Sequence, residues 1–226
     1  MHDADTAGGK GARLASGALD QSTLPTGMLA GLKAMRTDGT IENVSLGMNA
    51  HRKHMGRWTP SVIIDLIDAV PEGTIDSALL AYGWNLLCQD GLEVMVKCQQ
   101  AGIAVHIAGT FGGEQCAYLP CTPLPVPSAL TRSRAAAADS IFRPSEENKP
   151  RVEQWQALAD KHGVSLSAVA ISFACLPTVV SKVIFGMTTP EEVEMNMASL
   201  EEHPNVPVEI FAEAQAQGLL PESLDM

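Results

Sequence analysis

Hydrophobic residues from residue 26 onward alternate between helical spacing and short continuous runs. Met28, Leu32 and Met35 recur at the spacing of one helix face, and Gly39 follows as a stop signal, which predicts a helix. The same spacing, with Thr, Ser or Pro at the start and Gly or Pro at the end, predicts further helices. These are 59–70, 92–98, 151–162, a helix that begins at Ser165 or Ser167 and ends before Pro177, and a helix that begins at Thr189-Pro190.

Four short apolar runs indicate strands, at 41–48, 75–81, 103–108 and 179–185. They are apolar on both faces, which is typical of parallel strands covered by helices. Because strands and helices alternate along the chain, the predicted fold class is α/β. A barrel of eight strand–helix units takes about 250 residues. Four strands therefore correspond either to half of such a barrel or to a small open sheet.

The alternation is interrupted at 112–149. Prolines crowd this stretch, a run of alanines follows them, and proline cannot donate to a strand ladder. We therefore predict a long loop rich in Pro and Ala, of the kind that is usually functional or mobile inside compact domains. No internal repeat of fixed period is found, and the 226 residues suit one domain.

Charge and composition exclude several classes of protein. The chain has 15 basic and 26 acidic residues and a formal charge of −11, so nucleic acid is not an expected partner. No apolar run approaches the ~20 residues that cross a membrane, and the acidic N-terminus lacks a signal-peptide pattern. Five cysteines without a CxxC pair indicate reduced thiols. We therefore expect a cytoplasmic protein without a membrane partner.

Asn49 and the segment after the last strand could bind a ligand at the carboxyl ends of strands, where α/β folds place their sites. The Asn49 amide offers a donor and an acceptor together, which suits a carboxamide, although Asn also caps turns. Between Gly186 and Glu192, a glycine, hydroxyl residues and a helix start would leave backbone N–H groups free for an anion. Alternatively, Thr188 or Thr189 simply caps that helix.

His51 and His54 have the spacing of two metal ligands on a helix, but no third ligand accompanies them. We interpret them as surface histidines and expect no metal site. The sequence also lacks the GxSxG and HExxH motifs. Spacing alone therefore predicts a fold class but no reaction.

Longer phrases of the sequence carry a family resemblance. They are Leu32 to Arg36 with Gly39, Ile41 to Asn49, Asn85 to Leu87, Gly102 to Gly109, Lys161 to Leu166, Val179 to Gly186, Thr189 to Asn196 and Gly218 to Leu220. Together they resemble the aldo-keto reductases, and within them the D-threo-aldose (L-fucose) and L-galactose dehydrogenases. The resemblance covers roughly residues 1–120 and 150–221, in the order of the second half of that family's barrel.

The resemblance implies a partial TIM (β/α)8 barrel, roughly strands 5 to 8 with their helices. Residues 1–226 would form a single truncated domain that lacks the N-terminal half of the barrel. It also implies an NAD(P)-dependent oxidoreductase of the aldose or sugar dehydrogenase type, with a small aldehyde or sugar as substrate.

Individual residues match functional positions of that family. His2 matches the catalytic histidine after the fourth barrel strand, and Asn49 matches the residue that holds the nicotinamide carboxamide. Met48 replaces a Ser that is common elsewhere in the family. Ala81 and Ala108 stand where a carboxamide-binding Gln and a stacking aromatic are often found, although this branch often lacks both.

Residues after the last strand match positions that bind the rest of the cofactor. Gly186, Met187 and Thr188 match the phosphate-binding turn, and Asn196 matches the residue near adenine. Glu192 stands where a basic residue often binds the 2′-phosphate of NADP, and an acidic side chain there would repel that phosphate. The resemblance therefore favours NAD over NADP.

The family's catalytic Asp, Tyr and Lys have no counterpart here, because Tyr82 and Tyr118 match no catalytic position. We expect no turnover from this chain alone, since hydride transfer would lack its proton partner. A half barrel also leaves two unpaired sheet edges and a bare apolar face, which predicts a homodimer or a partner half. Three hypotheses follow: a C-terminal portion of a dehydrogenase, a non-catalytic nucleotide-binding or interaction module, or a decayed fragment.

Overall fold

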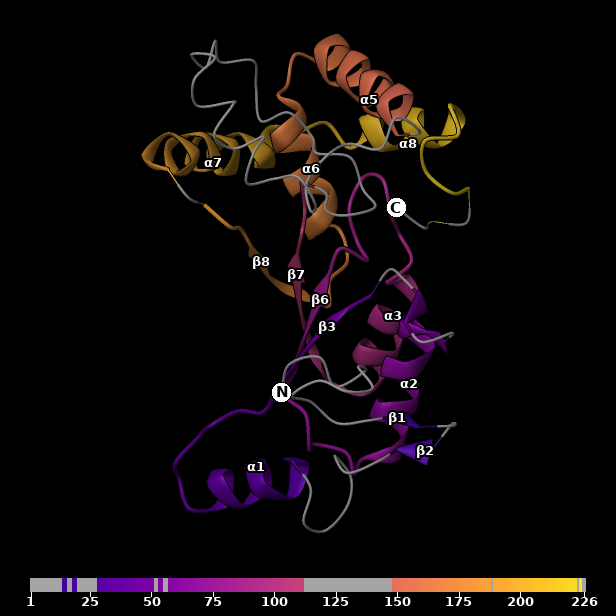
Figure 1. Cartoon of the computed structure of the whole chain (residues 1–226). Coiled ribbons are helices and arrows are strands. Elements are labelled where there is room, and N and C mark those ends of the chain that lie inside the picture. The colour runs from indigo at the N-terminus through magenta and orange to yellow at the C-terminus, as the bar shows by residue number, and fades with distance from the viewer. Residues whose placement is uncertain are drawn as a thin grey trace, which may run out of the picture. The chain divides into compact units, whose positions relative to one another are not determined.

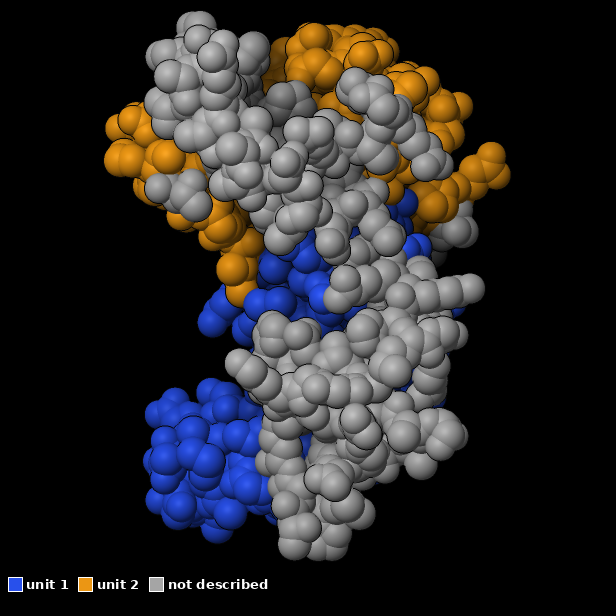
Figure 2. Space-filling model, in the orientation of Figure 1, with its two compact units in different colours: residues 1–84, 88–108, 177–182 blue, residues 85–87, 109–176, 183–226 orange. Residues whose placement is uncertain are grey.

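A computed structural model describes residues 14–15, 18–19, 28–50, 53–54, 57–111, 148–187, 189–222 and 224 (Figure 1). The chain divides into two compact units, which Figure 2 shows in different colours. Unit 1 comprises residues 1–84, 88–108 and 177–182, and unit 2 comprises residues 85–87, 109–176 and 183–226. Most of the predicted loop, 112–147, lies outside the described residues.

A four-stranded sheet confirms the predicted α/β class. β3 pairs with β6, and β6 pairs with β7, both in parallel. The first strand begins later than the predicted run, because the Ile41 N–H still bonds to the Met35 carbonyl at 3.2 Å. In sheet order the strands are β3 (Ser45–Asn49), β6 (Ser77–Ala81), β7 (Ala104–Ala108) and β8 (Val180–Ile184), of which β8 continues into unit 2.

The helices of unit 1 confirm the sequence pattern, whereas its shortest strands were not predicted. The helices are α1 (Met28–Thr37), α2 (Thr59–Ala69) and α3 (Leu92–Gln100). The short strands form two antiparallel pairs, β1 (Leu14–Ala15) with β2 (Ala18–Leu19) and β4 (Lys53–His54) with β5 (Arg57–Trp58). Strands of two residues are too short to show an alternating pattern.

The strands β3, β6 and β7 each bury the residues of one face, whereas β8 has no buried residue. Met48, Leu80 and Ile107 are at most 2% exposed, and Figure 1 shows α2 and α3 beside the sheet. The intervening residues, such as Leu79 and His106, are half-buried. The apolar runs predicted that both faces of the sheet are fully covered, whereas the second face is only half-buried. The residues at the carboxyl ends of the strands that are described below lie on this second face.

An ion pair connects α1 with the amino ends of the strands. Arg36 pairs with the Asp76 carboxylate and donates to the Gly73 carbonyl oxygen at 2.8 Å. Asp76 Oδ2 also accepts a hydrogen bond from the Val44 N–H at 2.6 Å. These contacts lie at the amino ends of the strands, the opposite end from Asn49, Ala81 and Ala108.

Unit 2 is helical. Of the two predicted start residues, Ser165 caps α6, since its Oγ accepts a hydrogen bond from the Ala168 N–H at 3.1 Å. Gly163, at φ +67°, ends α5 as predicted. The helix α8 was not predicted. In chain order the helices are α5 (Lys149–His162), α6 (Leu166–Cys175), α7 (Pro190–Glu202), the 3₁₀-helix η1 (His203–Asn205) and α8 (Glu209–Ala216).

Large aromatic side chains form the core of unit 2. Trp155, Phe173 and Phe211 are each at most 1% exposed. The rings of Phe173 on α6 and Phe211 on α8 have centroids 5.9 Å apart and a tilt of 52°, a favoured geometry for aromatic pairs. Unit 2 is therefore packed around α6, with α8 as a full contributor.

The interactions of Glu213 stabilise unit 2, and this stabilisation is expected to be lost at acidic pH. Its carboxylate on α8 accepts hydrogen bonds from Lys161 Nζ at 2.5 Å and from His162 Nε2 at 3.1 Å on α5. The Lys161 hydrogen bond, helped by the charge of Lys161 and by His162, lowers the pKa of Glu213 against a smaller opposing effect of desolvation. The Glu213 carboxylate therefore binds a proton less tightly in the folded state than in the unfolded state. The stabilisation that Glu213 gives the folded state is fully present above the unfolded pKa, and it is lost as pH falls through the folded pKa.

We expect Glu213→Gln to lower the urea midpoint of unfolding slightly at pH 7, and this difference to shrink to nothing as pH falls through the lowered pKa of Glu213. The matched control is Glu222→Gln, at an exposed position, which should behave as the wild type throughout this pH range. A difference between Glu213→Gln and the wild type that grows toward acidic pH would contradict this assignment.

Candidate functional site

Asn49, Ala81 and Ala108 lie side by side at the carboxyl ends of three neighbouring strands. The parallel register pairs Asn49 with Ala81 and Ala81 with Ala108. All three are half-buried, whereas the preceding residue of each strand is fully buried on the other face. The result is one amide flanked by two methyl groups, at the end of the sheet where α/β folds place their sites.

The backbone just beyond this row is firmly held. The Ala50 N–H donates to the Ala81 carbonyl oxygen at 3.0 Å, and the Tyr82 N–H donates to the Ala108 carbonyl oxygen at 2.9 Å. A Cβ at Gly83 would lie only 2.3 Å from the Ala50 carbonyl oxygen, so this approach requires glycine. The carboxyl ends of β3, β6 and β7 are thereby fixed relative to one another.

His106 lies one register step further from the carboxyl ends and was missed from the sequence. Gly47, Leu79 and His106 are paired in register on the same face as Asn49. Desolvation by burial, with a smaller effect of the Lys182 charge, lowers the pKa of His106 below its usual value, so the imidazole is neutral at pH 7. The sequence did contain a signal for it, because His106 is two residues from Ala108 on a predicted strand and such residues share a face of the sheet.

The segment after β8 belongs to unit 2 and leads into α7. Gly186 and Met187 are exposed, and Thr188 lies outside the described residues. Thr189 caps α7, since its Oγ1 accepts a hydrogen bond from the Glu192 N–H at 3.2 Å. This confirms the capping alternative for Thr189. The acidic first turn, with Glu191 and Glu192, complements the positive end of the helix dipole.

Asn196 is 6% exposed on α7, and Glu192 one turn earlier is half-buried on the same face. Val193 and Met197, each one residue further along α7, are exposed, as are Glu191, Glu194 and Glu201. The helix therefore has polar residues at buried positions and some apolar residues at exposed ones. Of the predicted site residues, the structure brings Glu192 and Asn196 together on α7; Asn49 lies in unit 1, and His2 lies outside the described residues.

Metal-dependent and thiol chemistry find no support among the described residues. His54 lies in the strand β4 and not on a helix, and His51 lies outside the described residues. No group of three or more His, Cys, Asp or Glu side chains suited to a metal ion occurs in the part of the chain that the structure covers. Burial raises the pKa of the Cys98 thiol to about 12, which keeps it protonated. Within the same ranges, no helix has the length and apolar character that a membrane crossing needs.

Comparisons with known proteins agree on one family. The family model "Aldo/keto reductase family" matches residues 22–213. Pyridoxal 4-dehydrogenase from Microbacterium luteolum is 26% identical over 190 residues, which are 84% of this chain and 48% of that protein. The chain therefore spans about half the length of this curated relative.

Solved structures show the same relation at the level of the fold. The holo and apo forms of the aldo-keto reductase AKR11C1 from Bacillus halodurans each match with a TM-score of 0.53, at 14% and 16% identity. The matches cover 88% and 87% of this chain and 57% of the other. The predicted partial TIM barrel is thereby confirmed as a fold.

Proposed function

Because this chain belongs to the aldo/keto reductase family, we propose that it supplies the cofactor-binding half of a nicotinamide-dependent sugar or aldehyde dehydrogenase. The observation that carries the proposal is the row of Asn49, Ala81 and Ala108 at the carboxyl ends of parallel strands. An amide beside two methyl groups suits a planar carboxamide, because the amide can both donate and accept while the methyl groups leave room for a ring.

The family positions that these residues match assign each of them a role in binding a dinucleotide. Asn49 would hold the nicotinamide carboxamide, while Gly186, Met187 and Thr188 would approach the phosphates near the start of α7. Asn196 would lie near the adenine. When bound, the cofactor supplies the hydride acceptor or donor, and the protein holds and orients it.

Glu192 supports NAD rather than NADP as the cofactor. The first turn of α7 carries Glu191 and Glu192 and no basic residue. A second negative charge on the ribose would be repelled there, whereas a free 2′-hydroxyl would not. In a calorimetric titration of this chain, NADH should therefore bind more tightly than NADPH.

Turnover requires groups that we propose come from outside the described residues. His2 would serve in catalysis, and the acid that exchanges a proton with the substrate oxygen would belong to a counterpart half. L-Fucose is the first substrate to test. Pyridoxal is the second, because the curated relative is named pyridoxal 4-dehydrogenase. We expect neither to produce NADH with this chain alone. The reduced thiols favour a cytoplasmic location.

Exposed apolar residues favour association with a counterpart half or a second copy. Ile184, Met187, Val193 and Met197, at the end of β8 and on α7, are between 41% and 52% exposed. In sheet order β3 and β8 are the outer strands, which could pair with further strands. The same features support the second candidate function, a non-catalytic nucleotide-binding or interaction module.

Calorimetric titration of the 226-residue chain with NADH tests the proposed function. We expect Asn49→Ala to weaken binding about tenfold, because a carboxamide hydrogen bond contributes about 1–1.5 kcal/mol. Asn205→Ala, at an exposed position in η1, is the matched control and should bind as the wild type does. Absence of NADH binding, or equal affinity of both variants, would overturn the proposal.

A further inference from the structure

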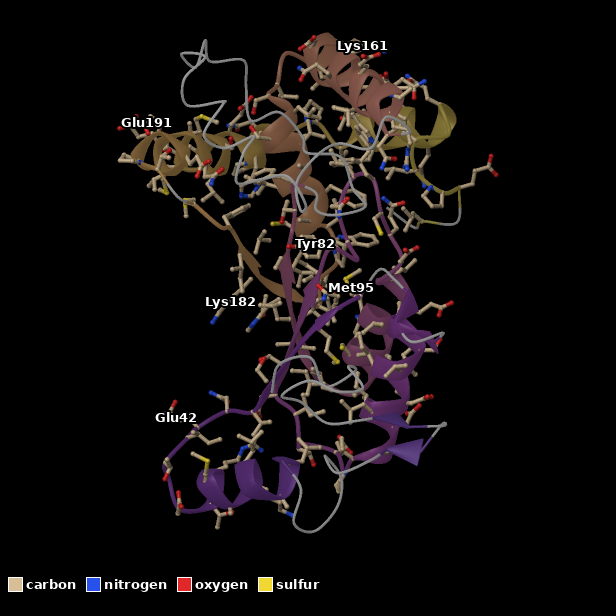
Figure 3. The ribbon with its side chains drawn as sticks, viewed as in Figure 1. Glu42, Tyr82, Met95, Lys161, Lys182 and Glu191 are labelled. Atoms are coloured by element: carbon tan, nitrogen blue, oxygen red, sulfur yellow. The ribbon has the colours of Figure 1, made fainter. Side chains whose placement is uncertain are left out.

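Hydroxyl groups connect α6 with α7 in the interior of unit 2. Ser167 on α6 and Ser199 on α7 are each at most 6% exposed, and their Oγ atoms lie 2.7 Å apart. Ser199 Oγ also donates to the Met195 carbonyl oxygen on α7 at 2.9 Å. Because a hydroxyl has one proton to donate, Ser167 is the donor in the pair. In Figure 3 the two helices meet near the end of α7 that is remote from the labelled Glu191.

A carboxylate connects the end of α7 with the start of α6. Glu202, the last residue of α7, accepts two hydrogen bonds from Ser165, which caps α6. The Ser165 N–H donates to Oε1 at 2.8 Å, and the Ser165 hydroxyl donates to Oε2 at 2.6 Å. Hydrogen bonds to a charged group are stronger than those between neutral groups. This contact therefore fixes α7 along its axis, whereas the contact between Ser167 and Ser199 fixes its rotation about that axis.

The rotation of α7 decides where Asn196 lies. Asn196 is one turn before Ser199 on the same face of the helix, and both residues are 6% exposed. Rotation of α7 by one residue, about 100°, would bring Met195 or Met197 to the place of Asn196. Apolar packing specifies such a rotation less strictly than a hydrogen bond does, because the hydrophobic effect has no direction. The hydroxyl pair is therefore the contact that selects the face on which Asn196 lies.

We propose that Ser167 and Ser199 are positioning residues for the cofactor, because their hydrogen bond holds Asn196 in the orientation that binds the adenosine part of a dinucleotide. Both side chains are buried and bonded within the protein, so they act through α7 and do not contact the ligand. For packing alone, alanine at both positions would serve about as well, since replacing both partners of a hydrogen bond by apolar groups is nearly neutral for stability. This inference rests on the proposed function, since it concerns the same ligand.

A variant with both Ser167→Ala and Ser199→Ala separates positioning from stability. Because it leaves neither hydroxyl without its partner, we expect its melting temperature to stay close to that of the wild type. Calorimetric titration should show NADH binding weakened about fivefold, within the range of couplings between neighbouring residues. The matched control carries Ser45→Ala and Ser77→Ala, a serine pair on β3 and β6 whose Oγ atoms lie 2.9 Å apart. It should bind NADH like the wild type.

Asn196→Ala completes the test. It should weaken NADH binding by itself, and adding the two serine substitutions should then cause no further loss, because the serines act through Asn196. If the double serine variant does not fold, Ser167→Ala alone takes its place with the same expectations for NADH. Unchanged NADH binding in the serine variant, a full further loss in the Asn196→Ala background, or a melting temperature far below that of the wild type would overturn the role of the serines alone. Failure of the wild type to bind NADH would overturn the proposed function and this inference with it.

Discussion

Gly83→Ala is expected to abolish measurable NADH binding and to lower the free energy of unfolding by about 3 kcal/mol, at the upper end of the usual cost of overpacking. The added Cβ would lie 2.3 Å from the Ala50 carbonyl oxygen and 2.7 Å from the Ala50 Cβ. Neither atom belongs to a flexible side chain, and the Ala50 N–H is bonded to Ala81 at 3.0 Å. The backbone at Ala50 must therefore move. Because Asn49 directly precedes Ala50, the Asn49 amide would move with it.

Urea unfolding and calorimetric titration with NADH would measure the two effects of Gly83→Ala. The matched control is Gly31→Ala in α1, where an added Cβ meets nothing within 4 Å. Because alanine favours a helix interior over glycine, the control should be more stable by about 0.5–1 kcal/mol. Wild-type stability together with wild-type NADH affinity in Gly83→Ala would contradict the close approach of these two chain segments.

Helices with both a period and a cap could be predicted from sequence. Ser165 and Thr189 stand directly before apolar-periodic segments, and in the structure both side chains accept a hydrogen bond from the first turn. α8 shows that the signal was present but overlooked. Ile210, Phe211 and Ala214 have helical spacing, Pro207 precedes them, and all three are buried.

Those features of the candidate site that depend on a single strand could be predicted from the sequence, and those that depend on several strands could not. Asn49 ends an apolar run, so its position at a carboxyl end is local information. The alignment of Ala81 and Ala108 beside it depends on the register between strands, which is determined by tertiary packing. The positive φ of Tyr82 contradicts the preference of its residue type. Only the hydrogen bonds around that turn account for it.

Phe211→Ala is expected to lower the free energy of unfolding of unit 2 by about 3–5 kcal/mol, the usual cost of deleting a buried phenylalanine. Phe211 is 1% exposed, and its ring lies 5.9 Å from that of Phe173, centroid to centroid. The truncation removes apolar area, leaves a cavity and deletes the aromatic pair. Urea unfolding followed by far-ultraviolet circular dichroism would measure the loss. It should also be larger than that of any surface substitution in α8.

Val208→Ala provides the matched control, because Val208 precedes the same helix and is 58% exposed. Its stability should remain within about 0.5 kcal/mol of the wild type. Phe173→Ala and the double variant complete a cycle in which the two losses should not add, since both remove the same pair. Strict additivity would mean that the two rings do not interact. A loss below about 1 kcal/mol for Phe211→Ala would mean that α8 is not part of the core, because a fully buried ring cannot be deleted at so small a cost.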